Sequence, residues 1–583
     1  MNAGQGAGAP SLPPRASTHA RPMVSVLIDL AVIAAAAGLL FGFRGFAGHW
    51  TSELRPTVEI DLSPWALPRY AFYSLSRGLL AYVFSLTFTL LYGYWAAKDK
   101  LAERVLLPLL DVLQSIPVLG FMPGLVLALV SLFPRSNMGL ELAAVVMIFT
   151  GQAWNMTFSF YHSLKSVPPE QREVASLYRF GPLRTLRRVE LPFATTGLVY
   201  NSMMSMAGGW FFLMVNEAFV LGDKDFRLPG LGAYMSVAAA RGDNRAMVFA
   251  MIAMVVMIAS LDQVVWRPLV VWAQKFRVED SASQVEARSW FYDVLHGSPT
   301  IHALRRWVRR AITRSVATAR AAAPNLRASD QTSRGQAIVT RVLFVVLVGL
   351  LALGGVRVVG VLAQAPPGAF RASVVGSGLT LSRVLVSTAL GTLWTVPAGL
   401  WIGLSPRASR VMQPVVQIAA SFPAPMLFPA VTALLHGLGV KLDYGSVVLM
   451  LLGTQWYILF NVIAGAAAIP ADLLEVATSY RFSTLQKLRT VYLPAVFPFL
   501  VTGWVTAAGG AWNASIVSEY VQLHGETLTA HGLGAVISVA AEHADFPSLA
   551  TSVGVMSIVV ILFNRTVWRW CYSVAERKFS LNK

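Results

Sequence analysis

The clearest chemical pattern in the chain is a pair of nearly identical octapeptides, EVASLYRF at 173–180 and EVATSYRF at 475–482. Each combines one carboxylate, one guanidinium and two aromatic rings, which are groups that suit binding between proteins. After each octapeptide the chain reaches a Leu-Pro step, at Leu191-Pro192 and at Leu493-Pro494. A loop that only connects two segments should drift after duplication, so the recurrence predicts two matched docking surfaces.

Catalytic chemistry is not indicated by the other reactive residues. The chain has no G-x-x-x-x-G-K-[ST] nucleotide loop, no H-E-x-x-H and no Cys/His cluster, and Cys571 is its single cysteine. His162, His531 and His543 have no metal-ligand spacing, and we interpret them as incidental. The sequence therefore predicts neither an enzyme nor a metal site, and any ATP chemistry must come from another polypeptide.

Composition predicts an integral membrane protein, because 55% of the 583 residues are hydrophobic and only 13% are charged, against about 25% charged in soluble proteins. The net charge of +18 could indicate nucleic acid binding. However, the basic residues lie in breaks between apolar runs, which is the pattern of a membrane protein that keeps its positive loops inside the cell. We therefore predict a lipid bilayer and no nucleic acid as partner.

Apolar runs long enough to cross the bilayer as helices divide the chain into two sets of six. We predict a disordered cytoplasmic N-terminus at 1–22, a first membrane domain at 23–273, a basic cytoplasmic linker at 274–338 and a second membrane domain at 339–583. The run that begins at Met23 is longer than a signal peptide core, so a retained span is favoured. In the linker, residues 301–323 form either a membrane-lying basic helix or a plain connector.

The two sets are one unit repeated in tandem. Trp154, Glu217 and Asp243 recur 302 positions later as Trp456, Glu519 and Asp545, and GLGA at 230 recurs at 532. The register holds through loops, which chance similarity between apolar helices would not do. We predict an all-α polytopic protein with two parallel six-helix repeats and about 12 transmembrane helices. The positive-inside rule places 161–192 and both termini in the cytoplasm.

The repeated stretch, with its spacing from Glu to Leu-Pro, resembles the EAA loop of permeases of type I ABC importers. Openings of the second span (SLSR at 74–77, TLSR at 380–383) and the Trp…Glu…GLG order in the fifth resemble the nitrate/sulfonate/taurine class. The resemblance implies a fused permease subunit that couples to two cytoplasmic ATPase copies, with a periplasmic or lipoprotein solute-binding protein and a small anion as solute. It also implies a bacterial inner membrane, with ATP and Mg²⁺ bound only by the ATPase.

On that resemblance the coupling loops comprise two matched sets of residues: Glu173, Ala175, Tyr178, Arg179, Phe180, Gly181, Leu191 and Pro192; and Glu475, Ala477, Tyr480, Arg481, Phe482, Leu493 and Pro494. The family's usual Gly at the seventh position is Arg179 here, and Arg481 in the second copy. Since Gly normally makes this turn, we expect the turn to move to Gly181 in the first copy and to Phe482-Ser483 in the second.

Candidate pathway residues are the charged and aromatic side chains of the second and fifth spans: Arg77, Trp210, Glu217, Arg383, Trp512 and Glu519. For Arg77 and Arg383 we expect snorkelling to the outer interface, with contact to an anionic solute as the alternative. For Glu217 and Glu519 a structural pairing is favoured over solute contact, and for the tryptophans packing is favoured. The prolines Pro117, Pro123, Pro423 and Pro429 predict kinks in the third spans.

A secondary transporter with two parallel repeats is the main alternative. It would show the same duplication, but it would not need matched loops after the fourth span of each half. It would also carry coupling carboxylates in mid-membrane, for which Asp29 and Asp111 are poor candidates because neither has a repeat partner.

Overall fold

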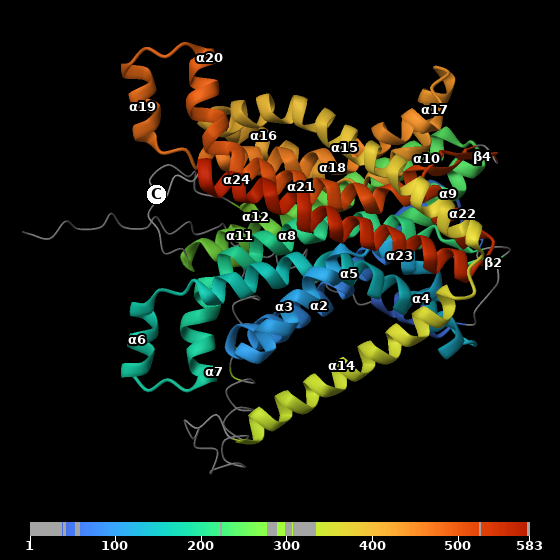
Figure 1. Cartoon of the computed structure of the whole chain (residues 1–583), viewed down its shortest axis with the longest axis horizontal. Helices are drawn as coiled ribbons and strands as arrows, with labels where there is room; N and C mark the ends of the chain where they lie inside the picture. The colour runs from blue at the N-terminus through green and yellow to red at the C-terminus, as the bar shows by residue number, and fades with distance from the viewer. Residues whose placement is uncertain are drawn as a thin grey trace, which may run out of the picture. The chain divides into compact units, whose positions relative to one another are not determined.

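The computed structural model describes residues 42–52, 59–221, 224–276, 289–297, 334–523 and 526–579, with Gly38, Arg306 and Arg310 as single positions. The regular secondary structure of the described residues is helical apart from two short β-hairpins (Figure 1). Residues 1–43 and 288–327 form one compact unit, to which α12 (Trp290–Gly297) belongs, and the remainder of the chain forms another. The predicted disordered N-terminus and most of the span from Met23 and of the helix at 301–323 lie outside the described residues.

The first half of the large unit contains one long run of helices. In order these are α2 (Leu67–Lys98), α3 (Lys100–Ser115), α4 (Val118–Leu132), α5 (Met138–Lys165), α6 (Pro169–Leu177), α7 (Pro182–Thr185), α8 (Leu191–Glu217), α9 (Leu231–Ala240), α10 (Asn244–Leu261) and α11 (Arg267–Ala273). A five-residue π-helical turn, η2 (Leu186–Glu190), joins α7 to α8, and another, η3 (Asp262–Trp266), joins α10 to α11. Strands β1 (Val220–Leu221) and β2 (Lys224–Asp225) pair antiparallel, with Val220 opposite Asp225.

The second half repeats this order element by element after α14 (Arg334–Leu362). It consists of α15 (Pro367–Leu404), α16 (Pro406–Ser421), η5 (Ala424–Met426), α17 (Phe428–Gly437), α18 (Leu442–Ala467), α19 (Ala471–Ser479), α20 (Thr484–Lys487), α21 (Leu493–Ser518), α22 (Leu533–Glu542), α23 (Phe546–Phe563) and α24 (Arg569–Phe579). The π-helical turns recur as η6 (Leu488–Tyr492) and η7 (Asn564–Trp568), and β3 (Tyr520–Leu523) pairs antiparallel with β4 (Glu526–Thr529). The tandem repeat predicted from sequence is therefore present in the fold.

Seven helical stretches among the described residues are long and apolar enough to cross a membrane, or eight if one bent pair counts as a span. That pair is α3 and α4, which meet at 95° around Pro117. A kink was predicted there, but the chain breaks, because Ile116 and Pro117 both have extended backbone. Short helices, α9 and α22, precede the last long helix of each half. The total of twelve spans stays a prediction.

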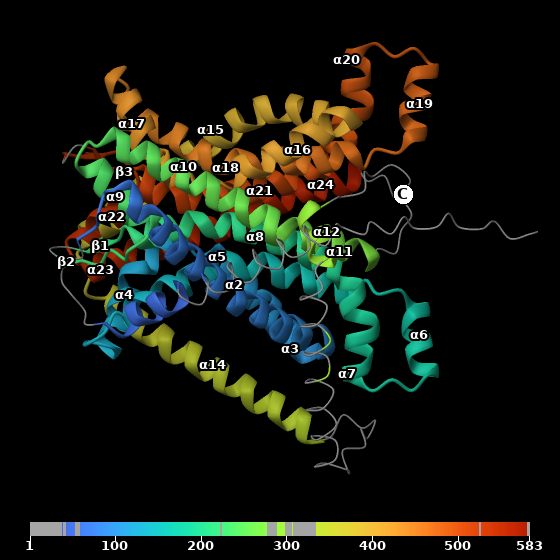
Figure 2. The same cartoon turned by 180° about the vertical axis from the view of Figure 1, so that it is seen from behind.

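The α6–α7 and α19–α20 hairpins project from the same end of the helical bundle (Figure 1). The β-hairpins and the short helices α9 and α22 lie at the opposite end, and Figure 2 gives the same arrangement from behind. The two halves therefore present equivalent elements in the same direction, as a parallel repeat requires.

Each half packs a segment of its third span, α4 in the first half and η5 in the second, against the other half. Met426 in η5 joins a buried apolar cluster made otherwise of first-half residues, and Val118 in α4 joins a cluster with Trp512 of α21. The backbone N–H of Val118 donates to Asn513 Oδ1 at 2.7 Å. Since each half supplies a segment to the core of the other, the two halves form a continuous apolar interior.

Candidate functional site

The first candidate site is the projecting hairpin that contains the repeated octapeptide. Helix α6 starts after Pro168, with Pro169 in its first turn, where a missing N–H costs nothing. It ends in a Schellman motif: Phe180 N donates to Ala175 O and Arg179 N donates to Ser176 O, each at 2.9 Å. This bonding pattern requires a left-handed residue, and Arg179 has φ of 48°.

The second hairpin ends its first helix in the same way. Phe482 N donates to Ala477 O at 2.9 Å, Arg481 N donates to Thr478 O at 3.0 Å, and Arg481 has φ of 51°. The expected shift of the turn to Gly181 and to Phe482-Ser483 is wrong. Gly181 has an ordinary φ of −67°, and Ser483 caps α20 in a capping box with Gln486. The hydrogen bonds of the motif fix the turn at the arginines.

The two hairpins expose the same surface. The Tyr178 and Tyr480 side chains are 71% and 73% exposed, whereas Ala175 and Ala477 are buried against their own hairpins. Glu173 and Glu475 are exposed, and among the described residues neither carboxylate has an ion-pair partner. Large aromatic groups left in water at matching positions are typical of a binding surface.

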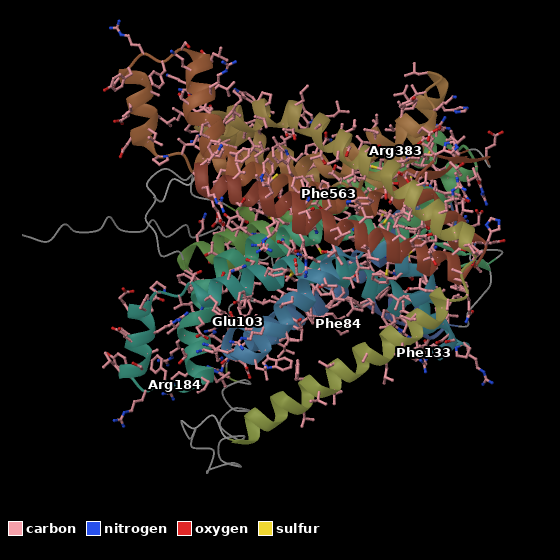
Figure 3. All side chains as sticks on the ribbon, in the orientation of Figure 1. Phe84, Glu103, Phe133, Arg184, Arg383 and Phe563 are labelled. Atoms are coloured by element: carbon pink, nitrogen blue, oxygen red, sulfur yellow. The ribbon has the colours of Figure 1, made fainter. Side chains whose placement is uncertain are left out.

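The remaining predicted loop residues serve the hairpin's own structure. Phe180 packs beside Tyr178, with ring centroids 6.0 Å apart, and lies under the guanidinium groups of Arg184 and Arg188. Figure 3 shows Arg184 on this hairpin. Leu191-Pro192 and Leu493-Pro494 begin α8 and α21 directly after the π-helical turns, so the Leu-Pro steps mark re-entry into the bundle.

The second candidate site is a buried ion cluster near the opposite end of the bundle. The guanidinium of Arg77 donates from Nε and Nη2 to the carboxylate of Glu141, both at 2.6 Å, and from Nη1 to Glu217 Oε1 at 2.7 Å. All three side chains are 0% exposed. The expected snorkelling of Arg77 is wrong, because its charge is neutralised by carboxylates from α5 and α8, which removes the need to reach water.

Further hydrogen bonds satisfy the buried carboxylate of Glu217. Ser74 Oγ donates to it at 2.7 Å and Gly232 N donates at 2.8 Å, while Ser74 Oγ accepts from Leu231 N at 3.0 Å. Glu141 also contacts His49 Nδ1 at 3.2 Å. The cluster thus ties α2, α5, α8 and the start of α9 together, which is the structural pairing favoured from sequence.

The second half contains the equivalent cluster with a more open edge. Arg383 Nη1 donates to Glu519 Oε1 and Nη2 donates to Asp443 Oδ1, both at 2.8 Å, and Thr380 takes the role of Ser74. Arg383 lies toward the end opposite the hairpins (Figure 3). The Arg383 side chain is 9% exposed and that of Asp443 is 30% exposed, so water reaches this cluster. Snorkelling is wrong here too, since both acids pair with Arg383.

Sequence reasoning missed Glu141, Asp443 and the contact of His531 with Asp443, whose atoms lie 3.3 Å apart. A signal for the acids was present, because Glu141 and Asp443 are separated by the same 302 positions (443 against 141) as Glu217 and Glu519. An acid retained in both copies within a helix of low charge is a strong sign of a buried partner. His531, interpreted as incidental, forms the exposed edge of this cluster.

The glycines of the GLG motif are explained by the carboxylates. A Cβ placed on Gly230 would lie 2.3 Å from the carboxylate of Glu217, and one on Gly532 would lie 2.2 Å from Glu519 Oε2. Neither carboxylate can retreat, because each is held by an arginine and by backbone N–H groups. The motif therefore keeps the backbone close enough to donate to a buried charge.

Changing Gly532 to Ala should destabilise the chain, because the added methyl group displaces Glu519 from Arg383. We expect a loss of at least about 1–3 kcal/mol in the free energy of unfolding, the usual cost of overpacking. Gly378→Ala in α15 is the matched control, since nothing lies within 4 Å of its Cβ position. Thermal unfolding of the two purified variants checks this, and equal midpoints would contradict it.

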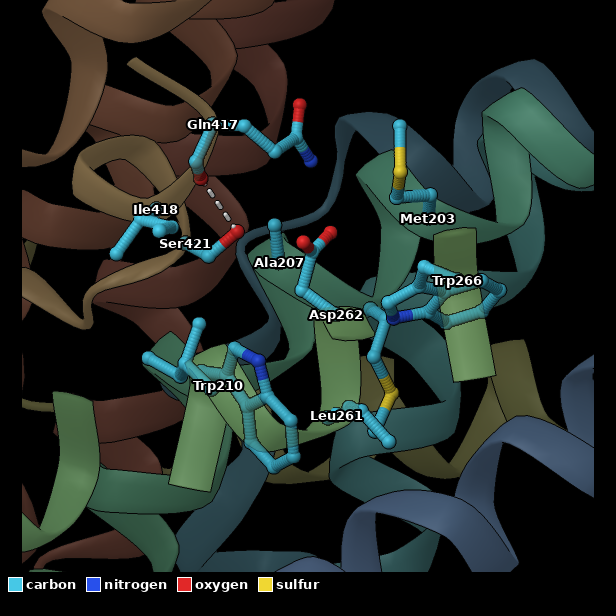
Figure 4. A pocket seen from close by; sticks show the side chains of 11 residues that line it. Met203, Ala207, Trp210, Leu261, Asp262, Trp266, Gln417, Ile418 and Ser421 are labelled. Atoms are coloured by element: carbon cyan, nitrogen blue, oxygen red, sulfur yellow. Dashed lines mark hydrogen bonds between the residues drawn. The ribbon is translucent and has the colours of Figure 1, made fainter. Parts of the chain in front are cut away.

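The tryptophans of the fifth spans are packing residues in this structure, as was favoured. Trp210 and Trp512 are each 2% exposed. Trp210 borders a cavity of about 10 Å³, roughly the space of one water molecule, that lies between α8 and α16 of opposite halves. Figure 4 shows Asp262, Gln417 and Ser421 around it, and Asp262 accepts from Arg267 Nε at 3.0 Å. Between these segments the halves are closed against each other.

The geometry defines a class of protein: a helical, membrane-embedded chain of two parallel repeats, each with one projecting hairpin. Two segments, 89–265 and 395–579, match the family described as "Binding-protein-dependent transport system inner membrane component". Together they cover more than half of the chain. The chain therefore belongs to this family and contains its domain twice, as the tandem duplication in the sequence predicted.

The chain spans only part of the length of the curated relatives that it matches. The chain is 22% identical over 183 residues to the taurine transport system permease protein TauC of Escherichia coli, which is 31% of this chain and 63% of the relative. It is 26% identical over 140 residues to the nitrate import permease protein NrtB of Leptolyngbya laminosa, 24% of this chain and 49% of the relative. It is 28% identical over 157 residues to the glycine betaine/proline betaine transport system permease protein ProW of Escherichia coli, 27% of this chain and 39% of the relative.

Proposed function

We propose that the chain is the membrane permease of an ATP-binding cassette importer and that it contributes both halves of the transmembrane pathway. The observation that carries this proposal is the pair of hairpins, which expose the same tyrosine, arginine and glutamate at the same end of the bundle. Two equal surfaces on one chain fit two copies of one partner, which is the cytoplasmic ATPase subunit.

In this proposal the chain itself binds no ATP or Mg²⁺ and acts as the mechanical part of the importer. Closure of the two ATPase copies on ATP brings the hairpins together, and the halves tilt about their shared apolar interior. The halves, which meet between α8 and α16, then separate toward the outside. Energy enters because the ATPase binds one arrangement of the hairpins better than the other.

The buried arginine clusters make such tilting a rigid-body motion. Each cluster fixes the second, fourth and fifth spans of its half at the end opposite the hairpins. Movement imposed at one end is therefore transmitted along whole helices and is not absorbed by local bending. In each cluster one arginine bridges two carboxylates and holds three helices together, so we assign Arg77, Glu217, Arg383 and Glu519 to the scaffold and not to solute contact.

We propose a small anion of the sulfonate or nitrate kind as the solute, supported by the names of the relatives for taurine, nitrate and aliphatic sulfonates. A periplasmic or lipoprotein solute-binding protein would deliver it at the end with the β-hairpins. The chain would lie in the bacterial inner membrane with both termini in the cytoplasm, because the basic hairpins belong on that side.

A gentle detergent pull-down of the tagged chain from its native host tests the proposal. We expect two copies of a nucleotide-loop ATPase for each chain, measured by mass spectrometry with stoichiometry. The recovered complex should hydrolyse ATP, and the cognate binding protein with solute should stimulate it. A chain that comes alone and moves solute in proteoliposomes without ATP would instead be a secondary transporter.

A further inference from the structure

Two arginines adopt a backbone conformation that side chains avoid. Among the described residues only three non-glycine residues have positive φ: Arg179, Arg481 and Ala544. A Cβ in the left-handed region crowds the following carbonyl oxygen, so glycine is the residue of lowest cost there. The chain therefore tolerates strain at the same position of both hairpins.

The third residue, Ala544, has a glycine at the equivalent turn of the other repeat, where the strain is absent. Ala544 is the counterpart of Gly242 at the 302-residue offset (544 against 242), and Gly242 has φ of 67°. At that turn one copy has glycine and the other has alanine, so the identity of the residue has drifted. At the hairpin turn both copies have arginine instead, which indicates that the side chain itself is used.

No contact within the described chain uses the two guanidinium groups. Both side chains are exposed, and in the part of the chain that the structure describes neither forms an ion pair, a side-chain hydrogen bond or a ring contact. In the first hairpin the arginines over Phe180 are Arg184 and Arg188. Both guanidinium groups therefore stand in solvent, where a second protein can reach them.

We propose that Arg179 and Arg481 are anchor residues that each bind a carboxylate on one of two identical ATPase subunits; this rests on the proposed function. Each arginine directly follows an exposed tyrosine, Tyr178 or Tyr480. A receptor for this pair needs an apolar groove with an acidic residue at its edge, since a carboxylate accepts two parallel hydrogen bonds from guanidinium. The two hairpins project from the same end of the bundle, where two copies of one partner can reach them.

Replacing both arginines with glycine distinguishes the effect of the side chain on ATPase binding from the effect of backbone strain on stability. The double variant R179G/R481G relieves the strain at the turn, so the isolated chain should unfold at the wild-type temperature or slightly above it. If the side chains are anchors, retention of the ATPase in the pull-down should nevertheless fall about tenfold or more, the usual effect of losing a charged hydrogen bond. Wild-type retention should also weaken as salt is raised.

Arg187 and Arg489 provide the matched control. They occupy equivalent positions in the π-helical turns, are exposed, and do not have the positive φ of Arg179 and Arg481. R187Q/R489Q removes the same charge from the same segments and should retain the ATPase. Wild-type-like retention by R179G/R481G would overturn the anchor role while leaving the importer assignment intact, and so would equal losses in both variants. If the wild-type chain brings down no ATPase, the proposed function fails and the anchor role fails with it.

Discussion

Replacing Arg77 with methionine should destabilise the purified chain more than the same change at Arg383. The substitution leaves Glu141 and Glu217 buried without a counter-charge, and breaking a buried ion pair in this way typically costs about 3–5 kcal/mol. Arg383→Met leaves Asp443 with a side chain that is 30% exposed, so water can replace part of the lost interaction. Thermal unfolding in one detergent, followed by tryptophan fluorescence, compares the two variants, and equal midpoints would contradict the prediction.

Neutralising Glu141 and Glu217 in the Arg77→Met variant should recover part of the lost stability. A chain with Arg77→Met, Glu141→Gln and Glu217→Gln has no unpaired buried charge, and neutral groups of similar size are far cheaper to bury. We expect its unfolding midpoint to lie between those of Arg77→Met and the wild type. A triple variant no more stable than Arg77→Met would mean that the guanidinium stabilises the chain mainly through shape and hydrogen bonds, and not by neutralising the two acids.

The repeated order of elements could be predicted from sequence because duplication leaves a register that survives within loops. Glu217 and Glu519, the GLG motif and the octapeptides all keep one offset, and each occupies an equivalent place in the fold. Helix propensity and hydropathy then sufficed for the long spans. The break at Pro117 was underestimated, because a proline predicts a kink but the extended backbone of Ile116 adds a 95° turn.

The ion clusters could be predicted only in part, because a tertiary contact decides where a charged side chain points. Arg77 alone in an apolar run is expected to reach for water, and its burial becomes favourable only because Glu141 on α5 and Glu217 on α8 lie beside it. The predicted position of the turn near Arg179 was wrong for a related reason. Propensity assigns the left-handed position to glycine, whereas the paired backbone bonds to Ala175 and Ser176 outweigh the strain.

Replacing Tyr178 and Tyr480 together with alanine should abolish ATPase retention. Aromatic anchors at protein interfaces typically contribute about 30-fold or more in affinity each, and the two act on one complex. Because both side chains are more than 70% exposed, the change removes almost no internal packing, so the isolated chain should unfold as the wild type does. The pull-down tests the loss of ATPase retention, and an unfolding measurement on the same preparation tests the unchanged stability.

Tyr444 supplies the control for this experiment, because its side chain is 73% exposed and it lies in the first turn of α18, away from the hairpins. Tyr444→Ala should keep the full complement of ATPase.

The single variants Tyr178→Ala and Tyr480→Ala distinguish two modes of docking. If each hairpin binds one subunit independently, each single variant should lose one of the two ATPase copies. If either single variant loses both copies, the subunits bind only as a pair. Full retention in the double variant would mean that the hairpin tyrosines are not the docking surface.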